Sequence, residues 1–172
     1  MKLNDRIHRF TVQRAALLER LEAMPPAQLS ARPRPGKWSI LEIVEHLALA
    51  ERAVLRGLPH PSLLSERERS LKHRILYLLV VFLLKARIPV RVPSREMAPG
   101  GDRSLSQSRH LWDENQAWLR AYVDQLDSSG LRRAVFVHPV AGPLTVAQAI
   151  RLGQIHLDVH ARQISLLCRQ HE

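Results

Sequence analysis

Apolar residues recur at helical spacing in five long segments of this 172-residue chain, and loops that contain proline separate most of them. The first segment covers about residues 3–23, and the others cover about 39–57, 62–87, 104–127 and 145–169. Such spacing is typical of amphipathic helices that bury one face. The pattern predicts an all-α fold, an antiparallel four-helix bundle with an additional helix and long proline-rich loops. At this length we expect residues 1–172 to form a single domain.

Three of these segments begin with a residue pair that stabilises a helix N-terminus. Ser39 with Glu42, Ser104 with Gln107, and Thr145 with Gln148 each match a capping box, in which two side chains satisfy free backbone N–H groups. The stretch from 128 to 143 is partly β-branched and rich in turn residues. We expect a short extended piece there, but no sheet.

Composition limits the partners of the chain. Lys and Arg number 26 against 16 Asp and Glu, which gives a net charge of +10. The basic residues are spread along the whole chain and accompany no nucleic-acid-binding motif, so nucleic acid is an unlikely partner. The one cysteine, Cys168, excludes an intramolecular disulfide. The N-terminus has no apolar signal segment, and we therefore expect a cytoplasmic protein.

One segment is apolar all round. Residues Ile75 to Leu84 form an uninterrupted apolar run, bracketed by Arg74 and Lys85. A spanning helix needs about 20 such residues, so we expect no transmembrane segment. A helix of this kind is usually buried in a core or at a subunit contact, and we expect this run to be largely buried, partly against a second subunit. Association with a membrane surface is the alternative.

The last predicted helix carries a metal-ligand spacing. His156 and His160 are four residues apart, so both imidazoles lie on one face, and that face is the apolar one. Burying two polar rings there costs free energy unless a partner satisfies them. Residue 157 is Leu, so the segment lacks the glutamate of the zinc-protease motif HExxH.

A third histidine lies in the second predicted helix. His46 shares a helical stripe with Ile43, Ala50 and Gly57, and the two small residues leave space beside it. Three neutral imidazoles from two facing helices would make an open site for a divalent metal and a substrate. The competing interpretation is that these are core histidines with a structural role.

The motifs together resemble the DinB-like superfamily. Its members share W-S-x-x-E-x-x-x-H-L in the first third, H-P-x-x-G-x-L-T near the end, and then H-x-x-x-H-x-x-Q-I. The matching residues here are Trp38, Ser39, Glu42, His46 and Leu47; His138, Pro139, Gly142, Leu144 and Thr145; and His156, His160, Gln163 and Ile164.

The resemblance implies a four-helix bundle of DinB-like type, commonly a homodimer, that holds a metal through His46, His156 and His160. Similar proteins include bacillithiol S-transferases and a mycothiol-dependent maleylpyruvate isomerase, whose branch uses a carboxylate ligand. This chain looks closer to the three-histidine branch. Glu42, His138 and Gln163 are candidates for supporting the ligands or lining the pocket, although the capping box already explains Glu42.

The resulting prediction is a divalent-metal-dependent enzyme of this superfamily, a thiol S-transferase or a hydrolase. Its substrate would be a small molecule, and a low-molecular-weight thiol is the co-substrate that the resemblance implies. Zinc, nickel and iron all accept imidazole ligands, so the sequence does not select one. The alternative is a non-catalytic metal-binding or stress-associated dimeric binding protein.

Overall fold

The computed structural model describes residues 3–64, 68–86, 88, 94–138 and 140–169, and most of these residues are helical. Its elements, in chain order, are α1 (Leu3–Glu22), α2 (Pro26–Ser30), α3 (Ile40–Arg56), η1 (Pro61–Leu63), α4 (Leu71–Lys85), η2 (Arg95–Met97), α5 (Leu105–Asp124), η3 (Gly130–Arg132), β1 (Ala134–His138), β2 (Gly142–Thr145) and α6 (Val146–Cys168). The three η elements are single turns of 3-10 helix.

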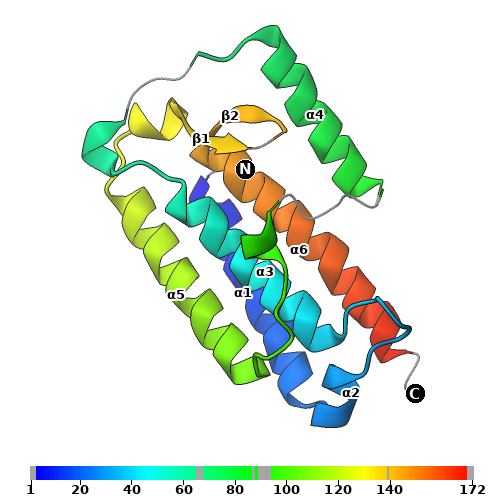
Figure 1. The fold of residues 1–172 in the computed structure, drawn as a ribbon. Coiled ribbons are helices and arrows are strands. Elements are labelled where there is room, and N and C mark those ends of the chain that lie inside the picture. The colour runs from blue at the N-terminus through cyan, green and yellow to red at the C-terminus, as the bar shows by residue number, and fades with distance from the viewer. Residues whose placement is uncertain (1–2, 65–67, 87, 89–93, 139, 170–172) are drawn as a thin grey trace.

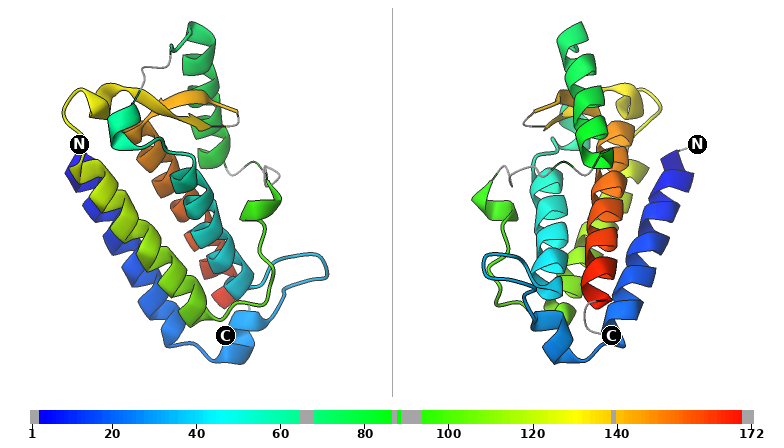
Figure 2. Two further views of the ribbon diagram at one scale, coloured as in Figure 1. Left: turned by 60° about the vertical axis from the view of Figure 1, so that its left-hand side comes forward. Right: turned by 90° about the vertical axis from the view of Figure 1, so that its right-hand side faces the viewer.

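Helices α1, α3, α5 and α6 lie side by side and form the predicted four-helix bundle (Figure 1). Helix α1 contacts α5 and α6, and α3 contacts the same two helices. Two further views show that α1 and α6 run in one direction and α3 and α5 in the other (Figure 2). Helix α4, the additional helix, belongs to the long connection between α3 and α5. This connection brings the chain back to the end of the bundle at which α3 begins. Neighbours α3 and α6 are therefore antiparallel, whereas α3 and α5 are parallel.

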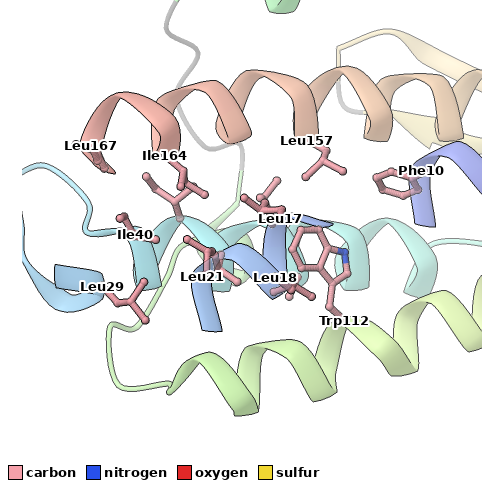
Figure 3. Close-up of a cluster of buried hydrophobic side chains, with 14 residues drawn as sticks. Phe10, Leu17, Leu18, Leu21, Leu29, Ile40, Trp112, Leu157, Ile164 and Leu167 are labelled. Carbon is pink, nitrogen blue, oxygen red and sulfur yellow. The ribbon is translucent and has the colours of Figure 1, made fainter. Parts of the chain in front are cut away.

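The largest hydrophobic cluster fills the centre of the bundle (Figure 3). Leu18 and Leu21 from α1, Ile43 from α3, Trp112 from α5 and Ile164 from α6 are each 1% exposed or less. Burying a large aliphatic side chain contributes about 1.5–3 kcal/mol, so these contacts fix how the four helices pack. The interface of α3 and α6 then determines where the histidines lie.

The three helix starts predicted from capping boxes are confirmed. Both hydrogen bonds of the capping box form at Ser39 before α3, at Ser104 before α5 and at Thr145 before α6. The third predicted helix begins later than expected, because a further capping box of Ser70 and His73 starts α4. Within the predicted range 62–87, residues 62 and 63 belong to η1, and residues 65–67 and 87 lie outside the described part.

The expectation of no sheet is wrong. Strands β1 and β2 pair antiparallel, with Phe136 opposite Leu144 and His138 opposite Gly142. Gly142 has φ +70°, and a Cβ there would lie 2.5 Å from the His73 ring of α4. The hairpin is stabilised because Phe136 and Leu144 are buried in a hydrophobic cluster with residues of α4 and α6. Neither short strand has a strong sequence pattern, so the sequence did not predict the pairing. Pro139, part of the recognised motif, lies outside the described residues.

Helix α4 is less buried than the sequence predicts. Only Tyr77, Val80 and Val81 are buried, and they face the hairpin and α6. Ile75, Leu78 and Phe82 are 58%, 61% and 62% exposed in the single chain. Burial against a second subunit remains a prediction. Within the described residues, none of the helices has the length and apolarity to cross a membrane.

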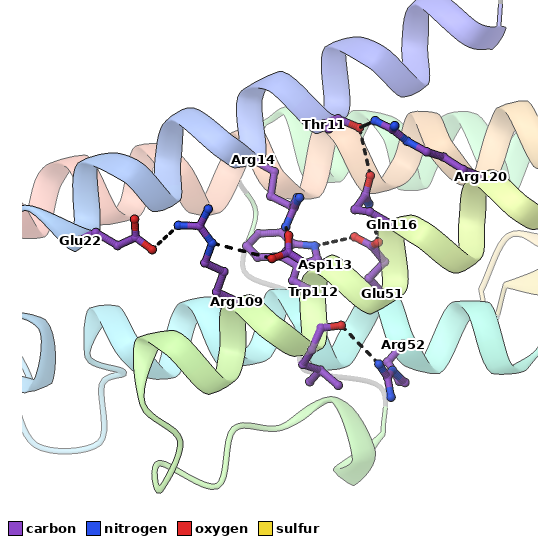
Figure 4. A network of polar contacts seen from close by, with 11 residues as sticks. Thr11, Arg14, Glu22, Glu51, Arg52, Arg109, Trp112, Asp113, Gln116 and Arg120 are labelled. Atoms are coloured by element: carbon purple, nitrogen blue, oxygen red, sulfur yellow. Dashed lines mark hydrogen bonds and ion pairs between the residues drawn. The ribbon is translucent and has the colours of Figure 1, made fainter.

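A polar network joins α1, α3 and α5 on the side of the bundle away from α6 (Figure 4). Arg14 pairs with Asp113 at 2.5 Å, and Trp112 Nε1 and Gln116 Nε2 both donate to the Glu51 carboxylate, at 2.7 and 2.6 Å. These bonds satisfy polar groups that the packing of the three helices removes from water.

Candidate metal centre

The packing of α3 against α6 brings three histidines together. His46 lies near the middle of α3 and is 4% exposed, whereas His156 and His160 lie one turn apart on α6 and are half-buried. Because both helices are amphipathic and bury their apolar faces, the histidine stripes predicted from the sequence meet at this interface. The structure thus brings together the three predicted ligands.

The three Nε2 atoms converge. His156 Nε2 lies 3.2 Å from His46 Nε2 and 3.1 Å from His160 Nε2, and the candidate ligand atoms all lie within 4.8 Å of one another. A tetrahedral ion with metal–nitrogen bonds of about 2.0–2.1 Å separates its ligand nitrogens by about 3.3 Å. The two separations that involve His156 match this value, and the three atoms are close enough together to bind one small divalent ion.

Hydrogen bonds on the far side of two rings determine which nitrogen can bind the metal. His46 Nδ1 lies 2.7 Å from the Met97 carbonyl oxygen, and since a carbonyl only accepts, Nδ1 carries the proton. His160 Nδ1 lies 3.0 Å from the Gln163 amide oxygen and donates in the same way. Both rings consequently direct an Nε2 lone pair into the cluster, and such outer partners also fix ring orientation.

His156 supplies the atom that faces both other rings. Its Nε2 lies next to the Nε2 atoms of His46 and His160. Metal binding through this atom needs the neutral tautomer that carries its proton on Nδ1, which leaves the Nε2 lone pair free to bind.

The electrostatics of the cluster favour neutral rings. Burial lowers the pKa of His46, and the hydrogen bond to Met97 opposes this. Burial and the neighbouring rings lower the pKa of His156 well below its usual value. Burial, followed by the charge of His46, lowers the pKa of His160 to about 4, despite the hydrogen bond to Gln163. At neutral pH all three imidazoles are therefore neutral, each with one ring nitrogen free of a proton, as metal ligands must be.

Within the described part of the chain, the cluster consists of histidines alone. Neutral ligands leave the full charge on a divalent ion, and three protein ligands leave at least one coordination position for water or substrate. The indole of Trp38 lies beside the cluster, with its ring centroid 4.9 Å from that of His46. The arrangement therefore suits an open site with one apolar wall.

The other candidate residues have different surroundings. Glu42 completes the cap of α3 through the Ser39 backbone N–H at 2.8 Å and pairs with Arg32 at 2.5 Å. Burial would raise the pKa of Glu42, but the Arg32 and Ser39 donors outweigh it and lower this pKa. His138 lies at the hairpin turn, where its Nδ1 accepts from the backbone N–H groups of Val140 and Ala141. Gln163 alone among these candidates bonds directly to a cluster histidine.

Two residues near the site had no identifiable sequence signal. The Met97 carbonyl is a backbone group 51 residues from His46, and no side-chain pattern marks it. Glu45 is buried at 2% exposure beside His46, and its carboxylate accepts from the Gly100 and Gly101 N–H groups. A glutamate within a helical segment, such as Glu45, gives no indication in the sequence of which distant loop its carboxylate will bind.

The fold and the site together define the class of this protein. It is a helical bundle with a candidate metal site of three histidines between α3 and α6. Residues 9–164 match the DinB superfamily, and the chain belongs to that superfamily. The resemblance found in the sequence is thereby confirmed.

Two solved structures share the fold. The four-helix bundle protein TT2238 is 25% identical, with a TM-score of 0.61 over 96% of this chain and 99% of that one. YfiT from Bacillus subtilis, titled a probable metal-dependent hydrolase with an unusual four-helix bundle topology, is 22% identical, with a TM-score of 0.62 over 99% of this chain and 87% of that one. Among curated proteins, none matches this chain.

Proposed function

We propose that this protein is a divalent-metal-dependent enzyme, a hydrolase or a thiol S-transferase, whose metal is held by His46, His156 and His160. The observation that carries the proposal is the convergence of three Nε2 atoms, two of which are already oriented as lone-pair donors by Met97 and Gln163. A structural role would leave the rings satisfied by protein partners. Among the residues that the structure describes, these Nε2 atoms have polar partners only in one another.

A divalent ion held by these three imidazoles would supply Lewis acidity toward a water or a thiol. The chain's own residues do the remaining work. The three imidazoles orient the open coordination position, Met97 and Gln163 hold two of the rings in place, and the Trp38 indole excludes water from one side.

Membership of the DinB superfamily supports metal dependence, and the fold shared with YfiT supports hydrolysis as one of the two reactions. Thiol transfer is supported by the resemblance to three-histidine S-transferases alone. We propose a small-molecule substrate, with a low-molecular-weight thiol as co-substrate in the transfer reaction, and a cytoplasmic location. Zinc, nickel and iron are all compatible with three imidazoles.

We also propose that the protein works as a homodimer that covers the outer face of α4. Leu71, Ile75, Leu78 and Phe82 recur at helical spacing on this face, and each is at least 58% exposed. A contiguous exposed apolar stripe is unusual on a soluble monomer and marks a contact surface.

The function is tested by assaying the metal-loaded protein against activated esters, and against an electrophile with low-molecular-weight thiols. We expect turnover in one of these assays, and we expect chelation or His156→Ala to abolish it. His8→Ala is the matched control, because His8 is an exposed histidine on α1 that should leave turnover unchanged. Turnover that persists in metal-free His156→Ala would contradict the proposal. Metal binding without turnover would instead favour the non-catalytic alternative.

A further inference from the structure

Glu45 is a buried carboxylate that immediately precedes His46 on α3. Its side chain is 3% exposed. Burying a charged group is costly unless partners surround it. The partners here are backbone groups: Oε1 accepts from Gly100 N–H at 3.1 Å and Oε2 from Gly101 N–H at 3.0 Å. Arg103 Nη1 lies 4.0 Å from Oε1 and adds a favourable charge.

The backbone at Gly100 and Gly101 is shaped to reach this carboxylate. Gly101 has φ +80°, a conformation that side chains other than glycine rarely adopt, and a Cβ at Gly100 would lie 2.9 Å from the Asp102 side chain. The turn therefore presents two consecutive N–H groups to a single acceptor. Such a bidentate arrangement fixes both the position and the direction of the segment.

The same segment carries the partner of His46. Met97, at the end of η2, lies three residues before Gly100, and its carbonyl accepts from His46 Nδ1 at 2.7 Å. η2 lies across α3 (Figure 1). The adjacent residues Glu45 and His46 of α3 therefore bind two points of the same segment, residues 97–101. Glu45 holds the segment, and the segment in turn holds the His46 ring.

We propose that Glu45 is a positioning residue for His46: by holding Gly100 and Gly101 it places the Met97 carbonyl, which sets the tautomer and orientation of the His46 ring. The effect on metal affinity rests on the proposed function, whereas the effect on the tautomer does not. Loss of an outer partner of a metal-bound histidine typically lowers metal affinity about 10–100-fold.

The test is nitrogen NMR of the histidine rings in metal-free protein, together with zinc affinity from competition with a chelating indicator. In the wild type we expect His46 to be protonated at Nδ1. We expect a mixture of tautomers and an affinity about 10–100-fold lower in Glu45→Ala. Glu45→Gln should fall between the two, because the amide keeps one acceptor for two N–H groups.

The matched control is Glu51→Ala, which removes a carboxylate from the same helix on the side that faces α5. We expect it to lower stability but to leave the His46 tautomer and zinc affinity unchanged. A general loss of stability would move both variants alike, so the comparison separates positioning from packing.

Three results would overturn the proposal. The first is a wild-type protein whose His46 is protonated at Nε2. The second is a folded Glu45→Ala variant with the wild-type tautomer and zinc affinity. The third is a Glu51→Ala control that changes the His46 tautomer and the zinc affinity as much as Glu45→Ala does. If Glu45→Ala does not fold, Glu45→Gln decides, with amide exchange of Gly100 and Gly101 in the wild type, which should be slow. A tautomer change in a protein that binds no zinc would support positioning while contradicting the proposed function.

Discussion

Replacing Glu51 by Gln should change how the stability of this protein depends on pH. The Glu51 carboxylate lies in the interface of α1, α3 and α5, where it accepts hydrogen bonds from Trp112 and Gln116 (Figure 4). Burial raises the pKa of Glu51 from 4.5 to about 7, against the opposing effects of these two donors and of Arg14. The folded state thus holds a proton on Glu51 in a pH range where the unfolded state has lost it.

The sign and the size follow from this difference. Between about pH 4.5 and about pH 7 the folded state binds more protons than the unfolded state, so the free energy of unfolding falls as the pH rises. A shift from 4.5 to about 7 corresponds to about 3 kcal/mol, fully lost above the folded pKa. Glutamine is uncharged at every pH and does not incur this loss.

The assay is urea unfolding of wild type and Glu51→Gln at about pH 4.5 and about pH 8. Titration of the histidine cluster affects both proteins alike and cancels in their difference. We expect the stability of Glu51→Gln relative to wild type to increase by about 3 kcal/mol over this range. Glu114→Gln is the silent control: a hydrogen bond from Arg52 lowers the pKa of Glu114, so its effect on stability falls below about pH 4.5 and should be almost absent over this range. A difference between wild type and Glu51→Gln that does not vary with pH would refute the reasoning.

Three further predictions concern the site and the surface. Gln163→Ala removes the acceptor of His160 Nδ1 and should lower zinc affinity about 10–100-fold in a competition titration, and an unchanged affinity would show that Gln163 does not support the ligand. Because burial lowers the pKa of His160 to about 4, the free energy of unfolding of metal-free wild type should fall as the pH falls from about 6.5 to about 4. This fall should be smaller in His160→Gln. Unfolding curves with the same pH dependence in both proteins would contradict the prediction. Leu78→Glu with Phe82→Glu should convert a dimer into a folded monomer in sedimentation, and a monomeric wild type would contradict the dimer.

The sequence predicted the parts of the fold that depend on local patterns. Capping boxes gave the starts of α3, α5 and α6, and apolar spacing on α3 and α6 placed the three histidines on buried faces. Those faces had to meet once the four helices formed a bundle. The candidate ligands were therefore identifiable before the structure, although their spacing of 3.1–3.2 Å was not.

Features that depend on contacts between distant segments were not predictable. The hairpin consists of two short strands that persist because Phe136 and Leu144 pack against α4 and α6. The run from Ile75 to Leu84 reads as a buried helix, yet one chain covers only one side of it. The Met97 carbonyl and the Glu45 carboxylate act through backbone groups, which have the same chemistry at almost every position and so leave no pattern.

The metal site is the central claim, and the metal content of the purified protein tests it most directly. Elemental analysis and zinc titration of wild type should give one ion per chain, with loss of binding in His156→Ala and retention in His8→Ala. An open site with three ligands has no spare donor, so removing one should abolish tight binding. Absence of a bound ion at saturating zinc, or retention of full affinity in His156→Ala, would contradict the account.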